Sequence, residues 1–213
     1  PTLLLALPIP VFVALGLWQL DRAEQKREQA QVLAERAAMP AFELTALVTD
    51  PETLRSRKLQ ARGVFDAGGQ ILIENRRHGN RTGFHVITPL RIDGSDLRVL
   101  VNRGWIPAAS DGSPAPAPVP DGSVTVTGES HIPSSPALIL HGGADSAKDW
   151  GVRWPYLTVD LYVAAFGHPT QPVVILQAPE DDGEFLRSWP REMPKEGMHL
   201  GYAIQWLAFA LIA

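Results

Sequence analysis

His199 is the residue whose setting most favours chemistry, because it lies in an apolar run without charges. Residues 198–213 contain no Asp, Glu, Lys or Arg. An ionisable side chain within or at the edge of such a run is costly to bury and points to a function. On a helix, His199, Tyr202, Trp206 and Phe209 would share one face. That face predicts an imidazole that could bind the metal of a flat, apolar macrocycle, with aromatic rings beside it. A histidine bonded at the level of lipid headgroups, within an aromatic belt, explains the same pattern.

Other candidates for chemistry are weaker. Five further histidines have no second ligand at a metal-binding spacing and are interpreted as surface or turn residues: His78, His85, His131, His141 and His168. The absence of Cys excludes disulfides, thiolate metal sites and a Cys nucleophile. Neither Gly-x-Ser-x-Gly nor His-Glu-x-x-His occurs. The run 76–78 (Arg-Arg-His) with Arg81 could bind an anion, and a hairpin tip facing water explains it equally well. These patterns predict a protein that is not an enzyme.

Composition narrows the class of partner. The net charge of -4, without a basic stripe, argues against nucleic-acid binding. A length of 213 residues indicates one domain of ordinary size with appendages. The 19 Pro and 18 Gly indicate many turns and favour β structure.

The two ends of the chain have the character of membrane segments. Residues 3–20 and 198–213 are uncharged runs of eighteen and sixteen residues. A spanning helix needs about 20 apolar residues. We therefore expect two truncated transmembrane helices, at 1–20 and 198–213. A signal peptide for the first run and a buried terminal helix for the second are the alternatives.

Between these ends the sequence predicts a helical stalk at 21–39 and a mainly-β domain at 40–197. The stalk consists of strong helix formers and ends before Pro40. The domain alternates apolar and polar residues between turns, which indicates a small barrel or sandwich of six to eight strands. The fold class is thus α+β. We expect strands at 58–65, 70–75, 84–92, 97–102, 124–129, 154–159 and 173–177.

Local signals predict the connections between these elements. The turn at 66–69 (Asp-Ala-Gly-Gly) would join the first two strands as a hairpin, and Asp93-Gly94 would join the next two. A helix is expected at 160–166, with Asp160 as its N-cap and Gly167 as its stop.

Three separated motifs, in order along the chain, resemble the Surfeit-one family (Surf-one/Shy-one-like) of cytochrome c oxidase assembly factors. The first is Leu-Gly-Leu-Trp-Gln-Leu-Asp-Arg at 15–22, followed by Lys26. The second is Thr-Pro-Leu at 88–90 with Val-Leu-Val-Asn-Arg-Gly-Trp-Ile-Pro at 99–107. The third is His-Leu-Gly-Tyr-Ala-Ile-Gln-Trp at 199–206, with Phe-Ala at 209–210.

The resemblance implies a multi-pass protein of the bacterial inner membrane with its main domain in the periplasm. It implies a role in the assembly of cytochrome c oxidase, by insertion or stabilisation of haem a in subunit I. The implied partners are the lipid bilayer, subunit I and haem a synthase. Some bacterial relatives are described as binding haem a, with a ligand that corresponds to His199; Tyr202 and Trp206 would complete the cofactor site. A scaffold that binds oxidase subunits without haem is the alternative.

The resemblance also singles out residues for partner contact or for structure: Trp18, Gln19, Arg22, Asn102, Arg103, Gly104, Trp105 and Gln205. Arg103 would contact a haem propionate or an oxidase subunit. The alternative is a strand end and turn, in which Gly104 serves the backbone, Trp105 the core, and Asn102 and Arg103 hydrogen bonds.

Overall fold

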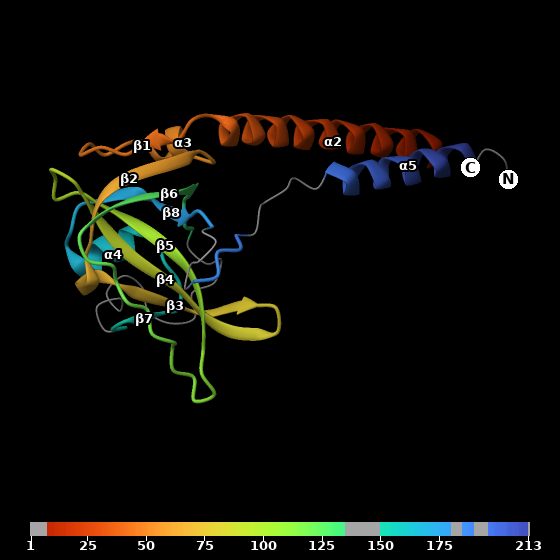
Figure 1. Ribbon diagram of the computed structural model, residues 1–213. Coiled ribbons are helices and arrows are strands. Elements are labelled where there is room, and N and C mark those ends of the chain that lie inside the picture. The colour runs from red at the N-terminus through yellow and green to blue at the C-terminus, as the bar shows by residue number, and fades with distance from the viewer. Residues whose placement is uncertain (1–7, 135–149, 180–184, 190–195, 213) are drawn as a thin grey trace. The chain divides into compact units, whose positions relative to one another are not determined.

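The computed structural model describes residues 8–134, 150–179, 185–189 and 196–212 (Figure 1). The chain divides into two compact units, one of residues 1–36 with 190–213 and one of residues 37–189. Each unit is described by itself below.

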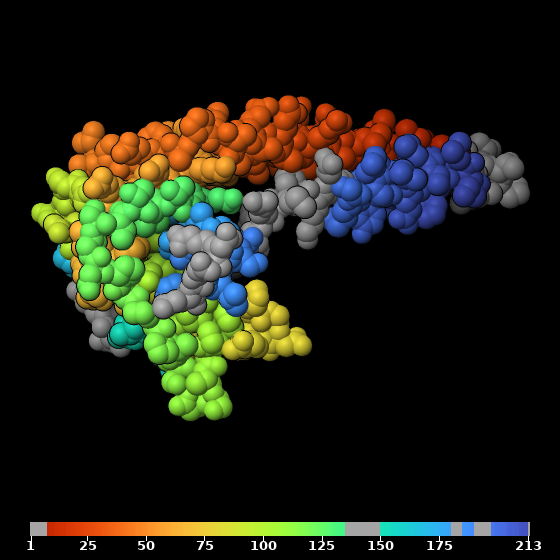
Figure 2. Space-filling model, in the orientation of Figure 1, coloured from red at the N-terminus to blue at the C-terminus, as the bar shows by residue number. Residues whose placement is uncertain are grey.

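The first unit is a pair of helices. Helix α2, Pro8–Ala38, runs without a break from the described part of the first apolar run, residues 8–20, through residues 21–38 of the expected stalk. Helix α5, Glu196–Ile212, covers residues 198–212 of the second apolar run. Figure 2 shows α5 packed alongside the first part of α2. Residue 12 contacts residue 206, and residue 19 contacts residue 199, so the two helices are antiparallel.

Among the described residues, no helix combines the length and the apolar character needed to cross a membrane. The two spans expected from the sequence stay a prediction.

The second unit is built on a closed barrel of five strands. Its strands follow the order β2 (Lys58–Phe65), β6 (Ser123–His131), β8 (Thr170–Gln177), β5 (Arg98–Pro107) and β4 (Arg81–Ile92). A further pairing of β2 with β4 closes the barrel. All these pairs are antiparallel except β5 with β8. The sequence left a small barrel or a sandwich open, and the structure shows a barrel. The expected six to eight strands are confirmed, since the described sheet has eight strands.

The three other strands extend the barrel at its margins. Strand β3 (Ile71–His78) pairs with β4, and β7 (Arg153–Trp154) pairs with β3. Strand β1 (Phe42–Glu43) pairs with β2. Two short helical segments precede β2 and β3, namely α3 (Pro51–Leu54) and the 3₁₀ turn η1 (Ala67–Gly69).

Buried and exposed residues alternate along strand β2, and its buried residues form part of the barrel core. Leu59, Ala61 and Phe65 point inward, where they meet Leu90 and Val101 from the facing strands. A second apolar cluster lies outside the barrel, between β3, β4, β5, β8 and helix α4 (Val159–Phe166). Both clusters bury large aliphatic side chains, each of which contributes roughly 1.5–3 kcal/mol by leaving water.

Two local predictions were wrong. Strand β2 does not form a hairpin with β3; both strands instead pair with β4, at different parts of its length. The turn η1 connects the end of β2 to the start of β3, so that the two strands pair with different parts of β4. The carboxylate of Asp66, the N-cap of η1, accepts a hydrogen bond from the Gly68 amide. The N-cap of α4 is Thr158, whose hydroxyl accepts from the Leu161 amide, so Asp160 lies in the first turn. The predicted stop is confirmed, because Gly167 has a φ of 72°.

The other hairpin is confirmed: β4 and β5 pair along their length around Asp93-Gly94. The strand expected at 154–159 is shorter, since β7 ends at Trp154 and the chain enters α4 soon afterwards.

Candidate functional site

The close contact of the helix pair is built on small residues. Gly16 of α2 is buried, and Ala203 of α5 has no exposed surface. A Cβ at Gly16 would lie 2.8 Å from Cδ2 of Leu207 and 3.6 Å from the carbonyl oxygen of Ala203. The backbones can approach here because neither residue carries a bulky side chain.

One turn beyond this contact, His199 meets Gln19. Nδ1 of His199 lies 2.8 Å from Oε1 of Gln19, and the pair is partly buried. An amide oxygen only accepts hydrogen bonds, so the imidazole donates its Nδ1–H. In a neutral ring the lone pair is then on Nε2, the atom that remains available to bind a ligand.

At the other end of the pair, three aromatic rings form a cluster. Phe12 stacks on Trp206 with ring centroids 5.8 Å apart, and Phe209 lies 5.9 Å from each of these two rings. Tyr202 lies outside this cluster with 48% of its surface exposed. The predicted aromatic face of α5 is therefore divided, because Trp206 and Phe209 pack against α2 whereas Tyr202 faces outward.

The remaining predicted residues of the helix pair lie on its outer surface. Trp18 is 49% exposed, and the guanidinium of Arg22 lies 5.7 Å from its ring centroid. Gln205 is also exposed. The structure thus brings Gln19 and His199 together and leaves Trp18, Arg22, Tyr202 and Gln205 away from that contact.

A cavity of about 600 Å³ opens between the helices beyond His199. Its lining combines apolar residues with two acidic side chains and one basic side chain: Leu20, Asp21, Ala23, Glu24, Arg27, Gly197 and Leu200. This mixture of charged and apolar walls suits an amphipathic group better than a purely apolar one.

Sequence reasoning missed Phe12 and Gly16, which complete the helix contact. The signal was present, because Phe12, Gly16 and Gln19 follow the i, i+4, i+7 spacing of one helix face. Gln19 was named for its motif, and its pairing with His199 was not foreseen.

In the barrel unit, the motif at 102–105 lies inside strand β5 and not at a strand end. The register of β5 against β4 shifts here, because Val86 pairs with Gly104 and Ile87 pairs with Asn102. Arg103 is the extra residue of this β-bulge. The Asn102 side chain accepts a hydrogen bond from the Gly104 amide at 3.2 Å, which stabilises the bulge.

The bulge directs the Arg103 side chain into the domain. Arg103 is 5% exposed, and its guanidinium lies 4.6 Å from the ring centroid of Phe185 and 5.4 Å from that of Phe65. Its Nη1 donates to Oε1 of Gln70, which also accepts from the Thr88 hydroxyl. These contacts make Arg103 part of the core packing.

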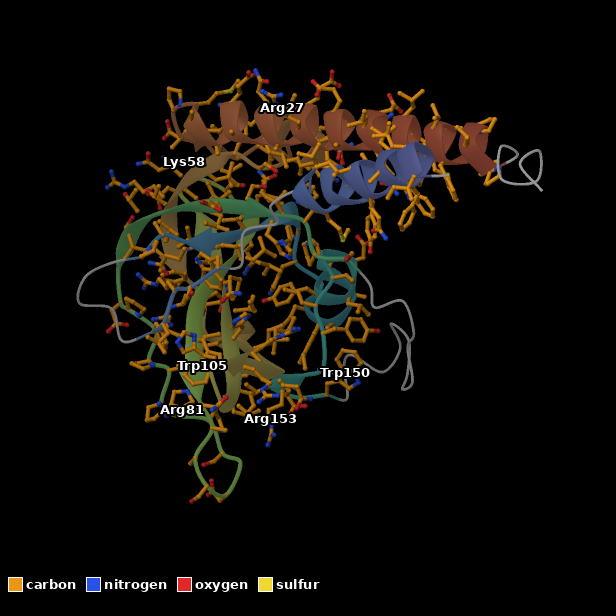
Figure 3. All side chains as sticks on the ribbon, turned by 90° about the vertical axis from the view of Figure 1, so that its right-hand side faces the viewer. Arg27, Lys58, Arg81, Trp105, Trp150 and Arg153 are labelled. Atoms are coloured by element: carbon orange, nitrogen blue, oxygen red, sulfur yellow. The ribbon has the colours of Figure 1, made fainter. Side chains whose placement is uncertain are left out.

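Trp105 is buried beneath the β3–β4 hairpin. Its indole N–H donates to the carbonyl oxygen of Arg76 at 2.9 Å. Above its ring lie the imidazole of His78, 5.5 Å away, and the guanidinium of Arg81, 5.6 Å away. Figure 3 shows Arg81 and Trp105 together at this end of the barrel. Trp105 thereby anchors the predicted anion-binding residues to the strand.

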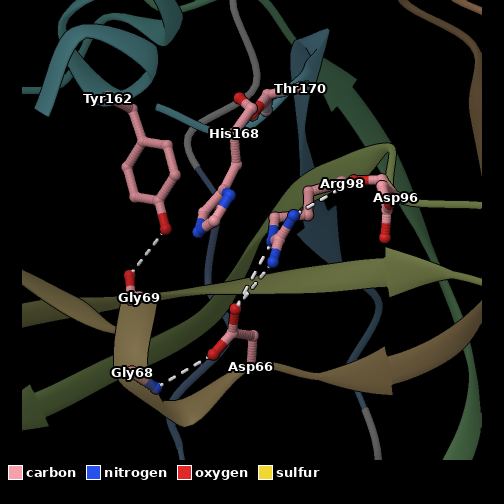
Figure 4. A network of polar contacts seen from close by, with 8 residues as sticks. All are labelled: Asp66, Gly68, Gly69, Asp96, Arg98, Tyr162, His168 and Thr170. Carbon is pink, nitrogen blue, oxygen red and sulfur yellow. Dashed lines mark hydrogen bonds and ion pairs between the residues drawn. The ribbon is translucent and has the colours of Figure 1, made fainter. Parts of the chain in front are cut away.

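A second polar network joins the turn after β2 to the start of β5 (Figure 4). Arg98 pairs with Asp66 at 3.2 Å, and its side chain is only 11% exposed. The hydroxyl of Tyr162 donates to the carbonyl oxygen of Gly69 at 2.8 Å. Burial raises the pKa of the Tyr162 phenol, and the Asp66 charge raises it further. The network fixes α4 and η1 to the barrel, which is a structural role.

The described residues contain no group of three or more His, Cys, Asp or Glu side chains that could hold a metal ion. His141 lies outside the described residues.

The described residues thus define a β-barrel domain joined in sequence to an antiparallel pair of helices. The model of the SURF1 family matches residues 6–211, and this chain belongs to the SURF1 family. The resemblance to the Surfeit-one family inferred from three motifs is confirmed. The family is generally known for cytochrome oxidase assembly factors.

Individual relatives agree with this assignment. The chain is 25% identical over 265 residues to Surfeit locus protein 1 of Arabidopsis thaliana, covering 98% of this chain and 74% of that protein. It is 26% identical over 232 residues to a SURF1-like protein of Monosiga brevicollis, covering 98% and 82%. A SURF1-like protein of Rickettsia bellii is 30% identical over 97 residues, covering 45% of this chain and 39% of that protein.

Proposed function

We propose that this chain is a membrane-bound, non-enzymatic assembly factor for cytochrome c oxidase that receives haem a as cargo at His199. Membership of the SURF1 family supports the assembly role. The observation that carries the haem role is the contact between His199 and Gln19. It commits Nδ1 to a hydrogen bond and leaves Nε2 as the ligand atom.

The residues around His199 fit a haem group. A haem iron takes a ring nitrogen of histidine as axial ligand, and the contact of Nδ1 with Gln19 leaves Nε2 of His199 for that role. Tyr202, half exposed one turn along α5, would contact the macrocycle edge. Trp206 is partly buried against Phe12 and would extend the apolar wall. Haem a would supply the metal centre of the oxidase, and this chain would hold and shield it before transfer to subunit I.

The helix pair supports attachment to a bilayer. Its outward side chains include large apolar residues with high exposure, among them Leu17 at 57%, Ile204 at 63% and Leu211 at 89%. Exposed apolar faces of this kind favour lipid or another apolar helix over water. We place the helices in the bacterial inner membrane, the barrel domain in the periplasm, and subunit I and haem a synthase as partners.

Membrane attachment can be tested by fractionation. Membranes from cells expressing the full chain are washed with alkaline carbonate, which removes peripheral proteins. We expect the chain to stay in the membrane pellet and to leave it only with detergent. Recovery of the folded chain in the buffer fraction would contradict the proposed anchoring.

The haem role is tested by purification from cells that produce haem a. The native chain is compared with His199→Ala and with His78→Ala, a control histidine on the barrel unit. We expect a haem absorption band in the native chain and in His78→Ala, and none in His199→Ala. Equal haem in all three, or none, together with loss of oxidase assembly on deletion, would favour a scaffold that works without haem.

A further inference from the structure

We infer that Gln19 is a positioning residue that fixes the tautomer and the orientation of His199. Its Oε1 atom lies 2.8 Å from Nδ1 of His199, a distance typical of a strong hydrogen bond. An amide oxygen cannot donate, so the bond exists only when Nδ1 carries the proton. Of the two neutral tautomers of His199, Gln19 therefore favours the one that has its lone pair on Nε2.

The pairing is specific to Gln19 among the glutamines of α2. Gln25 donates to Asp21, Lys26 donates to Gln29, and Gln31 donates to Glu35, all within the same helix. Gln19 instead contacts the neighbouring helix, 180 positions away in sequence. A glutamine used only for solvation would bond within its own helix as these others do.

The neighbouring contacts set the distance between Gln19 and His199. Phe12 and Trp206 stack at one end of the pair, and Gly16 allows close approach in the middle. Gln19 follows on the same face of α2, so it lies opposite His199 at the next level. Because the bond is partly shielded from water, it holds the ring more firmly than an exposed bond would.

The consequence for ligand binding rests on the proposed function. A histidine that binds a metal usually donates its other N–H to an acceptor, which orients the ring and raises its basicity. Loss of such an acceptor typically lowers metal affinity by about 10–100-fold. We therefore expect Gln19 to strengthen binding of haem iron by His199 without touching the iron itself.

The tautomer is measured directly, in the full chain in detergent and without haem. Histidine is labelled with ¹⁵N, and the His199 signals are assigned by their loss in His199→Asn. We expect native His199 to carry its proton on Nδ1. In Gln19→Leu the proton should move to Nε2, whereas Gln31→Leu, a control on the same helix, should leave it on Nδ1.

Gln19→Glu is a second variant, which keeps a side-chain oxygen that can accept the hydrogen bond from Nδ1 of His199. It should retain the proton on Nδ1, and circular dichroism should show native helix content. A native chain with the proton on Nε2, or a Gln19→Leu chain that keeps it on Nδ1, would overturn the inference. A proton on Nε2 in Gln19→Glu would overturn it also.

Titration with ferric haem, followed by absorption, separates this inference from the proposed function. Affinity should fall about 10–100-fold in Gln19→Leu and stay unchanged in Gln31→Leu. If native chain binds no haem while the tautomer still depends on Gln19, the haem role fails and the positioning role stands. If haem binds equally to Gln19→Leu and to the native chain, the effect of Gln19 on ligand binding is refuted.

Discussion

Leu207 occupies the space that a side chain at Gly16 would need. A Cβ built at Gly16 would lie 2.8 Å from both Cγ and Cδ2 of Leu207. Carbon atoms pack at about 3.5–4.0 Å, so the contact leaves no room for even a methyl group unless Leu207 moves. Because the same face carries Phe12 and Gln19, the spacing at Gly16 controls how well the whole helix pair is held together.

We predict that Gly16→Val destabilises the helix pair by about 1–3 kcal/mol, the usual cost of overpacking. Gly201→Ala is the matched control, because it lies in α5 with nothing within 4 Å of its Cβ position. It should be neutral or stabilising by up to about 1 kcal/mol through helix propensity. Thermal unfolding in detergent and the NMR contact between the Phe12 and Trp206 rings check the prediction. An unchanged ring contact in Gly16→Val would contradict it.

A second glycine tests the β-bulge. Gly104 has a φ of 132°, and a Cβ there would lie 2.6 Å from Cβ of Phe185. We expect Gly104→Ala to cost about 2–4 kcal/mol, from backbone strain and overpacking together. Gly94 also has a positive φ, but no atom lies within 4 Å of a Cβ built there. Gly94→Ala should therefore cost only about 1 kcal/mol, from backbone strain alone. Urea unfolding measures both, and equal costs would show that the contact with Phe185 is unimportant.

The sequence predicted those elements whose signals are local. Residues 58–65 alternate strictly, and β2 has these bounds. Asp93-Gly94 predicted a hairpin because Asp-Gly is a favoured turn sequence and lies here between two apolar runs. The pairing of β4 with β5 confirms it. The sequence could not decide between a barrel and a sandwich. The pairing of β2 with β4 that closes the barrel depends on packing between strands that are distant in sequence.

The sequence identified the key residue of the candidate site, His199, but could not predict which residues contact it. His199 stood out because a single imidazole lies in an uncharged run. Its pairing with Gln19 requires the register of two antiparallel helices, which no short-range pattern encodes. Likewise the bulge at Arg103 follows from a one-residue shift of β5 against β4, so the motif lies within a strand and not at its end. The expected core position of Trp105 and the expected hydrogen bond of Asn102 are confirmed.

A third prediction concerns the buried side chain of Gln171. Its Oε1 accepts from the Thr49 amide at 3.1 Å, and its Nε2 donates to the carbonyl oxygen of Leu47 at 2.7 Å. Leu47 itself is 74% exposed, so the loop has little apolar packing to hold it. In Gln171→Leu we expect faster hydrogen exchange of the Thr49 amide and a loss of about 1–3 kcal/mol. Gln60→Leu, on the exposed face of β2, should leave this exchange rate unchanged.

The fourth prediction concerns the histidine next to Trp189. The rings of His85 and Trp189 meet edge to face, 5.6 Å apart. Burial lowers the pKa of His85 to about 4, with smaller contributions from the charges of Arg76 and His131. In the unfolded chain the pKa is near 6.5, so the unfolded state binds the proton first as the pH falls.

Stability should therefore be unaffected by His85 above about pH 6.5 and should fall between about pH 6.5 and 4, by up to about 3 kcal/mol. His85→Gln removes the titrating group, so its unfolding free energy should fall less over this range than that of the native chain. Trp189→Leu opens the site to water, relieves part of the desolvation and should raise the pKa of His85. Urea unfolding at pH 7 and pH 5 measures the effect of His85 on stability, and NMR titration measures the pKa of His85 in the native chain and in Trp189→Leu. If native chain and His85→Gln lost equal stability on acidification, the buried imidazole would not be the group responsible.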